Sequence, residues 1–134
     1  MNYWLMKTEP ETFSWQDLVK QKRTIWDGVR NYQARNNMMA MKKGDKVLIY
    51  HSVSDKCVVG IAVVNKEFFS DPTTDDKRWV AVELVPDKPL KKTISLEQIK
   101  STKELAKMKL IKQSRLSVMP VSKLEFNKIL ELGG

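Results

Sequence analysis

Short runs of apolar, aromatic and β-branched residues divide the chain into candidate strands separated by polar segments. Residues 3–6 form the first run, and three more occupy residues 46–51, 57–65 and 78–85. Residues of these types fit a pleated, half-buried sheet. The polar segment 52–56 is short enough for a turn, so the second and third runs are expected to pair as an antiparallel hairpin.

Polar segments between these runs carry the signals of short helices. Ser14 is placed to cap a helix, and Asp17 lies near its positive end. Residues 31–41 are predicted to form a second helix that Lys43-Gly44 closes. In the C-terminal third, three serines each precede a Gln or Glu by three residues, a spacing that predicts three more helix starts. The pairs are Ser95 with Gln98, Ser101 with Glu104, and Ser122 with Glu125.

One closing strand and one loop complete the predicted order. Residues 116–119 alternate and are ended by Pro120, which suits a last strand. Residues 70–76 are polar and predict a loop without structure of its own. This order predicts an α+β fold in which short helices surround a small mixed β-barrel of about five strands. Regular βαβ units are missing, which argues against a doubly wound nucleotide-binding fold.

Length and composition fit one domain that spans residues 1–134. With 42% hydrophobic and 30% charged residues, the chain lies in the range of globular proteins. No apolar run approaches 18 residues and no signal peptide pattern is present, so no membrane partner and a cytoplasmic location are expected. The single cysteine, Cys57, excludes an internal disulfide and is expected to be buried in an apolar strand.

The net charge of +8 is distributed unevenly along the chain. From Lys88 to Lys128 there are 11 lysines and arginines against three glutamates, so the whole excess lies in the C-terminal third. A basic surface attracts nucleic acid, and contacts with its backbone are expected from Lys91, Lys92, Lys109 and Lys112. The alternative is a solvated lysine-rich surface, since Lys outnumbers Arg 19 to 5 and phosphate contacts favour Arg.

Residues 26–37 combine aromatic, cationic and amide side chains in one short stretch. An aromatic face stacks on a base with roughly 1 to 3 kcal/mol, an Asn amide offers a donor beside an acceptor, and Arg binds phosphate or stacks on a ring. Trp26 and Asn31 stand five residues apart across the Gly28 turn and could meet a base face and its edge together. The alternative is that Trp26 and Tyr32 are core aromatics whose polar neighbours coat a helix.

Motifs for catalysis, metals and cofactors are missing from the sequence. His51 is the single histidine, and no G-x-S-x-G motif accompanies it. One His and one Cys without paired carboxylates predict no metal site. Phosphate-cradling glycine loops are also missing, so no cofactor is expected.

Four blocks of sequence carry a resemblance to a known family. Residues 3–10, 26–37, 50–52 and 114–118 resemble, in the same order, the EVE domain family of thymocyte nuclear protein and its bacterial relatives. The resemblance covers the whole chain. It implies a PUA-like fold, a small mixed β-barrel related to YTH domains, in which a pocket holds a modified base of DNA or RNA. The segment 70–77 is shorter and less aromatic than in many relatives, which puts any ligand contact of that loop in doubt.

The resemblance also implies which residues form the pocket. Trp26 and Val29 are expected as walls, and the polar members as readers of the base edge or anion contacts. Trp4, Trp15 and Trp79 are expected in the core instead, with Trp79 inside a strand. Met38, Met39 and Met41 are expected to pack the helix on the barrel. The ten residues expected at the pocket are Lys7, Trp26, Val29, Arg30, Asn31, Arg35, His51, Ser52, Ser114 and Arg115.

The leading functional hypothesis is a monomeric, non-enzymatic module that binds nucleic acid and reads a modified or flipped base. One alternative is a small enzyme acting on a nucleotide or RNA base, with His51 as general acid or base. Another is a module that binds a small molecule or another protein. The sequence leaves open which modification is read and whether DNA or RNA carries it.

Overall fold

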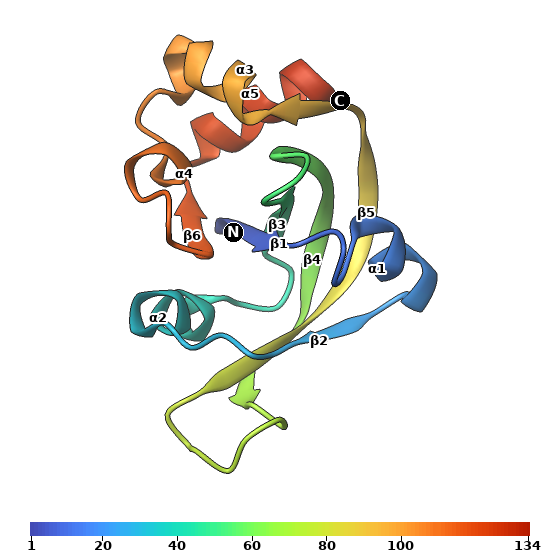
Figure 1. The fold of residues 1–134 in the computed structure, drawn as a ribbon, viewed down its shortest axis with the longest axis vertical. Coiled ribbons are helices and arrows are strands. Elements are labelled where there is room, and N and C mark those ends of the chain that lie inside the picture. Colours follow the sequence, from blue (N-terminus) through green and yellow to red (C-terminus); the bar gives the residue numbers. More distant parts are fainter.

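A computed structural model describes residues 1–134 and consists of one curved, six-stranded mixed sheet with short helices around it (Figure 1). β1 pairs in parallel with β3 and antiparallel with β6, whereas the other neighbours are antiparallel. In sheet order the strands are β2 (Thr24–Trp26), β5 (Val80–Ser95), β4 (Cys57–Ser70), β3 (Lys46–His51), β1 (Tyr3–Thr8) and β6 (Val118–Val121).

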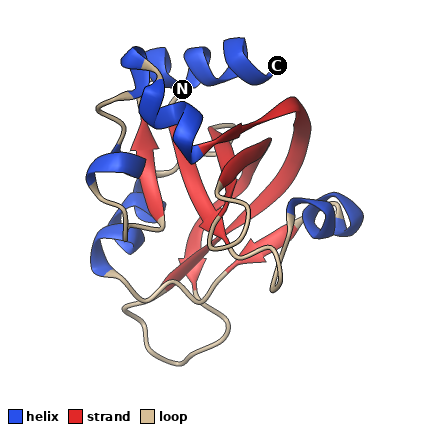
Figure 2. Ribbon diagram, turned by 45° about the horizontal axis from the view of Figure 1, so that its top comes forward, coloured by secondary structure: helices blue, strands red, loops and turns tan.

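The helices are short and lie on the outside of the sheet (Figure 2). Several gather at one end of the molecule, near the C-terminus, while α1 and α2 lie on opposite sides of β2 (Figure 1). The mixed α+β class is as predicted. The helical elements are α1 (Trp15–Gln21), α2 (Tyr32–Ala40), α3 (Leu96–Ser101), the 3-10 helix η1 (Lys103–Leu105), α4 (Lys109–Lys112) and α5 (Lys123–Gly133).

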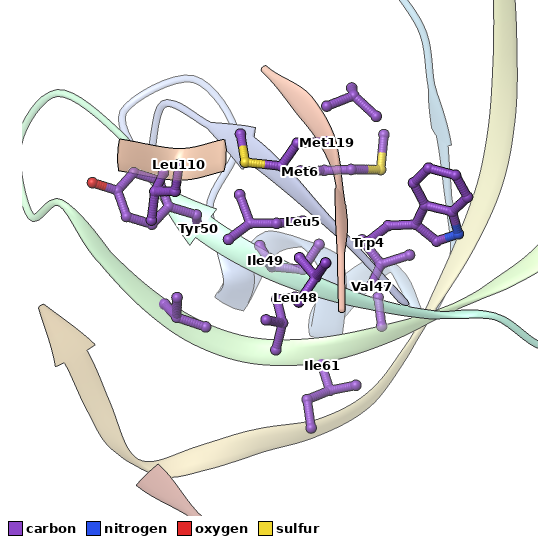
Figure 3. Packing of buried hydrophobic residues seen from close by; sticks show 14 of the residues in the cluster. Trp4, Leu5, Met6, Val47, Leu48, Ile49, Tyr50, Ile61, Leu110 and Met119 are labelled. Atoms are coloured by element: carbon purple, nitrogen blue, oxygen red, sulfur yellow. The ribbon is translucent and has the colours of Figure 1, made fainter. Parts of the chain in front are cut away.

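A hydrophobic core of 33 buried residues joins the sheet to its helices. Side chains from β1, β3 and β4, including Leu5, Leu48 and Ile61, pack against one another at its centre (Figure 3). Trp4 and Trp15 are buried as predicted. Cys57 is buried as well, and burial raises the pKa of its thiol.

None of the helices has the length and apolar character needed to cross a membrane.

The serine caps confirm two of the three predicted C-terminal pairs. Ser122 and Glu125 form a reciprocal capping box at the start of α5, and Ser95 accepts the backbone N–H of Gln98 at the start of α3. The prediction for Ser101 was wrong. Ser101 is the last residue of α3 and donates to the carbonyl of Gln98, so the following 3-10 helix begins after Thr102 without a side-chain cap. The short helix α4 carries no cap signal and was not predicted.

The strands differ from the sequence prediction mainly in length and number. β5 continues ten residues beyond residue 85. β2 is a sixth strand, and its three residues are too few to give a recognisable strand pattern in the sequence. Pro120 lies within β6 rather than after it, which an edge strand tolerates because one side of it needs no N–H donor. α2 ends at Ala40, and Gly44, with a φ of 94°, serves the turn into β3 instead of closing the helix.

Helix α1 is fixed to the sheet through its first residue. A Cβ atom added to Gly60 of β4 would lie 2.6 Å from two carbons of the Trp15 indole, so the indole packs directly on the glycine. The backbone N–H of Trp15 donates to Nε2 of His51, at 3.0 Å, from the end of β3. These two contacts hold the segment that leads into α1 beside the end of β1.

Candidate functional site

A pocket of about 600 Å³ opens between the end of β1, the segment before α1, and β2 with the turn that follows it. Residues far apart in the sequence meet there, because β1, β2 and the segment before β6 converge. Side chains of every class needed to hold a flat polar ring line it: an aromatic ring, an aliphatic wall and two cations. Its lining includes Lys7, Phe13, Trp26, Val29, Arg30 and Ser117, together with the carboxylates Glu9 and Asp27.

Trp26 is the last residue of β2 and forms a wall of this pocket. Its backbone is positioned by pairing with Val82 of β5. Its ring stands perpendicular to that of Phe13, with 6.2 Å between the ring centroids. The side chain is only partly buried, and Val29 is buried to a similar degree nearby. Trp26 therefore packs against the protein and still offers surface to the pocket.

The turn after Trp26 is held by a buried aspartate from the loop between β4 and β5. Gly28 has a φ of 77°, and its N–H donates to Oδ2 of Asp71 at 2.8 Å. The same oxygen accepts Nη1 of Arg30 at 2.9 Å, while Nη2 of Arg30 donates to Thr73. Asp71 is 2% exposed. The turn and the guanidinium of Arg30 are thereby fixed before any ligand arrives.

Several hydrogen bonds outweigh the burial of the Asp71 carboxylate. Burial alone would raise its pKa, but donors from Thr73, Arg30 and Gly28 hold the pKa well below the ordinary value. Asp71 is therefore ionised at neutral pH and fully bonded. Sequence reasoning missed it, because only a polar loop marked its position and nothing local connects it to Arg30, 41 residues away.

Lys7 joins β1 to the segment before β6 at the back of the pocket. Its backbone N–H donates to the carbonyl of Ser117 at 2.9 Å, and its Nζ donates to the carbonyl of Ser114 at 2.7 Å. Burial lowers the pKa of Lys7. The ammonium group is thus a positioned donor, two of whose three hydrogens remain for a ligand.

A second, smaller hollow of about 340 Å³ is lined in part by chain neighbours of pocket residues. It contains Asn31, Ser114 and Arg115 from the predicted set, together with Lys112. Asn31 and Leu116 line this hollow, and their chain neighbours Arg30 and Ser117 line the pocket. Asn31 is also the N-cap of α2, since its Oδ1 accepts the N–H of Ala34 at 2.9 Å.

Three residues of the predicted set line neither space. His51 is buried, with Nε2 bonded to Trp15 and Nδ1 lying 3.4 Å from Asp55. Ser52 lies behind the pocket, where its N–H and hydroxyl donate to the carbonyl of Thr8. Arg35 lies on the surface of α2, where its guanidinium carbon is 5.0 Å from the ring centroid of Tyr32.

Trp79 and Tyr32 form an aromatic pair outside the main core, with 5.1 Å between ring centroids. Trp79 is buried, but it lies just before β5 and not inside a strand as expected. Arg30 and Arg78 lie over its ring at 5.5 and 6.0 Å. Hydrogen bonds from Arg78 hold the pKa of Asp76 at about 2. These arginines are thus already occupied by aspartates and aromatic rings.

The four lysines expected at a nucleic-acid backbone are separated in the fold. Lys112, the last residue of α4, lines the smaller hollow, and Lys109 is the first residue of that helix. Lys91 and Lys92 are exposed on the far half of β5, nine or more residues along that strand from the partner of Trp26. His, Cys, Asp and Glu side chains do not gather in groups of three or more that could hold a metal ion.

Comparison with known proteins finds a matching family model and similar folds. A model of the EVE domain matches residues 2–132. Mouse thymocyte nuclear protein 1 is 36% identical over 98% of this chain and 73% of its own length. A crystal structure of a protein from Agrobacterium tumefaciens, 41% identical, has a TM-score of 0.98 and covers 100% of this chain and 94% of that one. The crystal structure of human THYN1 in complex with 5-methylcytosine-containing DNA is 33% identical, with a TM-score of 0.92, covering 98% of this chain and 97% of that one.

Proposed function

The chain belongs to the EVE domain family, and from this premise we propose that it is a non-enzymatic nucleic-acid-binding module that reads a modified or flipped base. One observation carries the proposal: the pocket combines the Trp26 ring, the Val29 side chain and the cations of Lys7 and Arg30. The human relative that was crystallised with 5-methylcytosine-containing DNA supports the same class of ligand.

The energetics favour a base that is already out of the duplex. Taking a base from the stack costs a few kcal/mol, and stacking on an aromatic ring returns roughly 1 to 3 kcal/mol. Hydrogen bonds from donors such as Lys7 and the apolar contact of Val29 must supply the rest. A single-stranded or mismatched modified base is therefore expected to bind more tightly than a fully paired one.

A methylated cytosine suits the chemistry of this pocket. The C5-methyl group of a pyrimidine is read by apolar contact, and Val29 and Ile25 bring aliphatic surface to the lining. We propose 5-methylcytosine in DNA as the first ligand to test.

A cytoplasmic location of the protein stays a prediction from the sequence.

The enzyme alternative finds little support at His51. A general acid or base must lie within hydrogen-bond reach of the reacting group, but His51 is buried outside the pocket and bonded to Trp15. Glu9 and Asp27 are the carboxylates that line the pocket. Mass spectrometry of a bound 5-methylcytosine oligonucleotide, held for hours with excess protein, is expected to return the base unchanged. Conversion of the base would favour the enzyme and overturn the proposal.

The binding test compares oligonucleotides that differ only in the methyl group, with Trp26→Ala as the pocket variant. Because stacking is lost, the affinity of Trp26→Ala for the methylated oligonucleotide is expected to be about 10-fold to 100-fold lower than that of wild type. Phe68→Ala is the matched control, because Phe68 is a partly exposed aromatic residue of β4 outside the pocket. Equal affinities of wild type and Trp26→Ala, both folded by thermal melting, would contradict the pocket assignment.

A further inference from the structure

The smaller hollow beside the pocket is cationic and free of carboxylates. Its lining consists of amides, one hydroxyl, one leucine and the two cations Lys112 and Arg115. Both cations are exposed. The Nδ2 group of Asn31 adds a donor without a protein partner, because the N-cap bond uses only Oδ1. An anion with several acceptor oxygens would satisfy these groups together.

Lys112 and Arg115 differ from Arg30 and Arg78 in having no acidic partner. Arg30 pairs with Asp71 at 2.9 Å, and Arg78 pairs with Asp76 at 2.6 Å. No carboxylate lies within 4.0 Å of Lys112 or Arg115. Arginine offers a planar fork of donors that matches phosphate oxygens, and lysine adds a compact charge. The two residues are therefore cations of the smaller hollow that are available to bind an external phosphate.

We propose that this hollow is a phosphate subsite, in which Arg115 and Lys112 hold the phosphodiester next to the base that occupies the pocket. The proposal rests on the proposed function and extends it from the base to the backbone. Asn31 supplies a further hydrogen bond to the same phosphate.

The two spaces are lined by neighbouring residues of the chain, an arrangement that suits a single nucleotide unit. Arg30 and Asn31 are neighbours in the chain, as are Leu116 and Ser117, and neighbouring Cα atoms are about 3.8 Å apart. One member of each pair lines the pocket and the other lines the hollow. A base and the phosphate on its own sugar are joined by only a few bonds. Lys7, bonded to the carbonyl of Ser114, lies at the boundary between the two.

The decisive experiment uses ligands with and without the phosphate. Wild type, Lys112→Gln/Arg115→Gln and the control Lys91→Gln/Lys92→Gln are titrated with 5-methyl-2′-deoxycytidine, its 5′- and 3′-monophosphates, and a short single-stranded DNA containing it. Both double variants lose the same charge, but the control lysines lie on the far half of β5. Thermal melting checks that all three proteins are folded.

The subsite variant is expected to bind the nucleoside within twofold of wild type and to lose about tenfold in affinity for the DNA at low salt. Log affinity decreases with log salt concentration, and the steepness of this decrease should be smaller by about 0.7 in the subsite variant, because one contact with a single-stranded phosphate is lost. The control should keep the wild-type slope. One of the two monophosphates should show the same loss as the DNA, which identifies the side of the sugar on which the phosphate lies.

Three outcomes would overturn the inference. Equal losses in both double variants would mean that a diffuse positive field and not a subsite attracts the backbone. Loss of nucleoside binding in the subsite variant would make the hollow part of the base pocket. Unchanged affinity of the subsite variant for both the nucleoside and the DNA would remove Lys112 and Arg115 from the interface. Failure of wild type to bind any of the ligands would instead reject the proposed function itself.

Discussion

Asp71 is the residue on which the geometry of the pocket depends most. Its two oxygens bond to Gly28, Arg30 and Thr73, and it is buried in the process. A buried charge of this kind is tolerated only when it is fully hydrogen-bonded. Gly28 reaches its φ of 77° at a position where L side chains are strained, so the carboxylate and the glycine together define the turn.

Asp71→Asn is expected to lower both stability and affinity. The amide has one acceptor oxygen where the carboxylate has two, and Arg30 loses its charged partner, so the free energy of unfolding should fall by about 3 kcal/mol at pH 7. Ligand affinity should drop as well, because Arg30 is no longer fixed at the rim. Urea titration and ligand binding at a temperature well below the melting midpoint separate the two effects. Thr74→Ala, in the same loop but with its hydroxyl bonded to the N–H of Asp76, is the control.

The contribution of Asp71 to stability is also expected to depend on pH. Its pKa is lower in the folded protein than the ordinary carboxyl value of 3.8. The unfolded chain therefore binds the proton first as pH falls, and the folded state loses this stabilisation below about pH 4. The difference in unfolding free energy between wild type and Asp71→Asn should be largest near pH 6 to 7 and shrink by pH 3. A difference that stays constant across this range would contradict the role assigned to the charge.

Residue types left Trp26 open as a stacking or a core residue, and the family resemblance predicted it as a pocket wall, but neither indicated which residues support that wall. Lys7, Val29 and Arg30 also line the pocket as expected. Asp71 and Phe13 were not predicted, because their contacts join segments distant in sequence. His51, the single histidine of the chain, was expected at the pocket, but its hydrogen-bond partner places it in a structural role. Its Nε2 is occupied by the N–H of Trp15, a contact that no sequence pattern reveals.

At the scale of elements, the contact of Trp15 with Gly60 decides where α1 lies. Gly60, inside β4, leaves room for the Trp15 indole, and Phe13, two residues before Trp15, lines the pocket. Glycine in a strand interior often marks the close approach of another group. Here the group is a side chain from the first residue of a helix, and the contact places one side of the pocket.

Gly60→Ala is expected to destabilise the protein by about 1 to 3 kcal/mol, because the added methyl group overlaps the Trp15 ring. A double-mutant cycle with Trp15→Leu provides the control. The smaller side chain leaves space, so Gly60→Ala should cost much less in the Trp15→Leu background. Additive losses in unfolding free energy, measured by urea titration, would show that the alanine acts through strand propensity and not through the indole.

Regular elements were predictable where their signals are local. The β-branched runs marked β3 and the start of β4, and serine caps marked α1, α3 and α5. The strand β2 could not be found, since its three residues acquire a strand conformation only by pairing with β5. The helix start predicted at Ser101 was wrong because Ser101 bonds backward to Gln98 instead of capping the 3-10 helix η1.

At the scale of the whole molecule, the sequence located the positive charge but not its arrangement. The excess lies between Lys88 and Lys128, yet this segment runs along β5, turns through three short helical elements and ends in α5. Lys112 comes to lie beside the pocket, whereas Lys91 and Lys92 do not. Charge counts along a chain predict attraction to nucleic acid, but the contact points depend on topology.

The bond between Lys7 and Ser114 joins positions 107 residues apart, and this separation has a consequence for protein synthesis. β1 is synthesised before the other strands of the sheet, but its antiparallel partner β6 and the carbonyls that hold Lys7 are synthesised after all the other strands. Long-range pairing of this kind must wait until β6 has left the ribosome. Stalled chains with a flexible C-terminal extension long enough to clear the exit tunnel should capture 5-methylcytosine DNA, and those without it should not. Capture by both would mean that the pocket forms without β6; otherwise, a nascent chain stays unable to bind nucleic acid until β6 has left the ribosome.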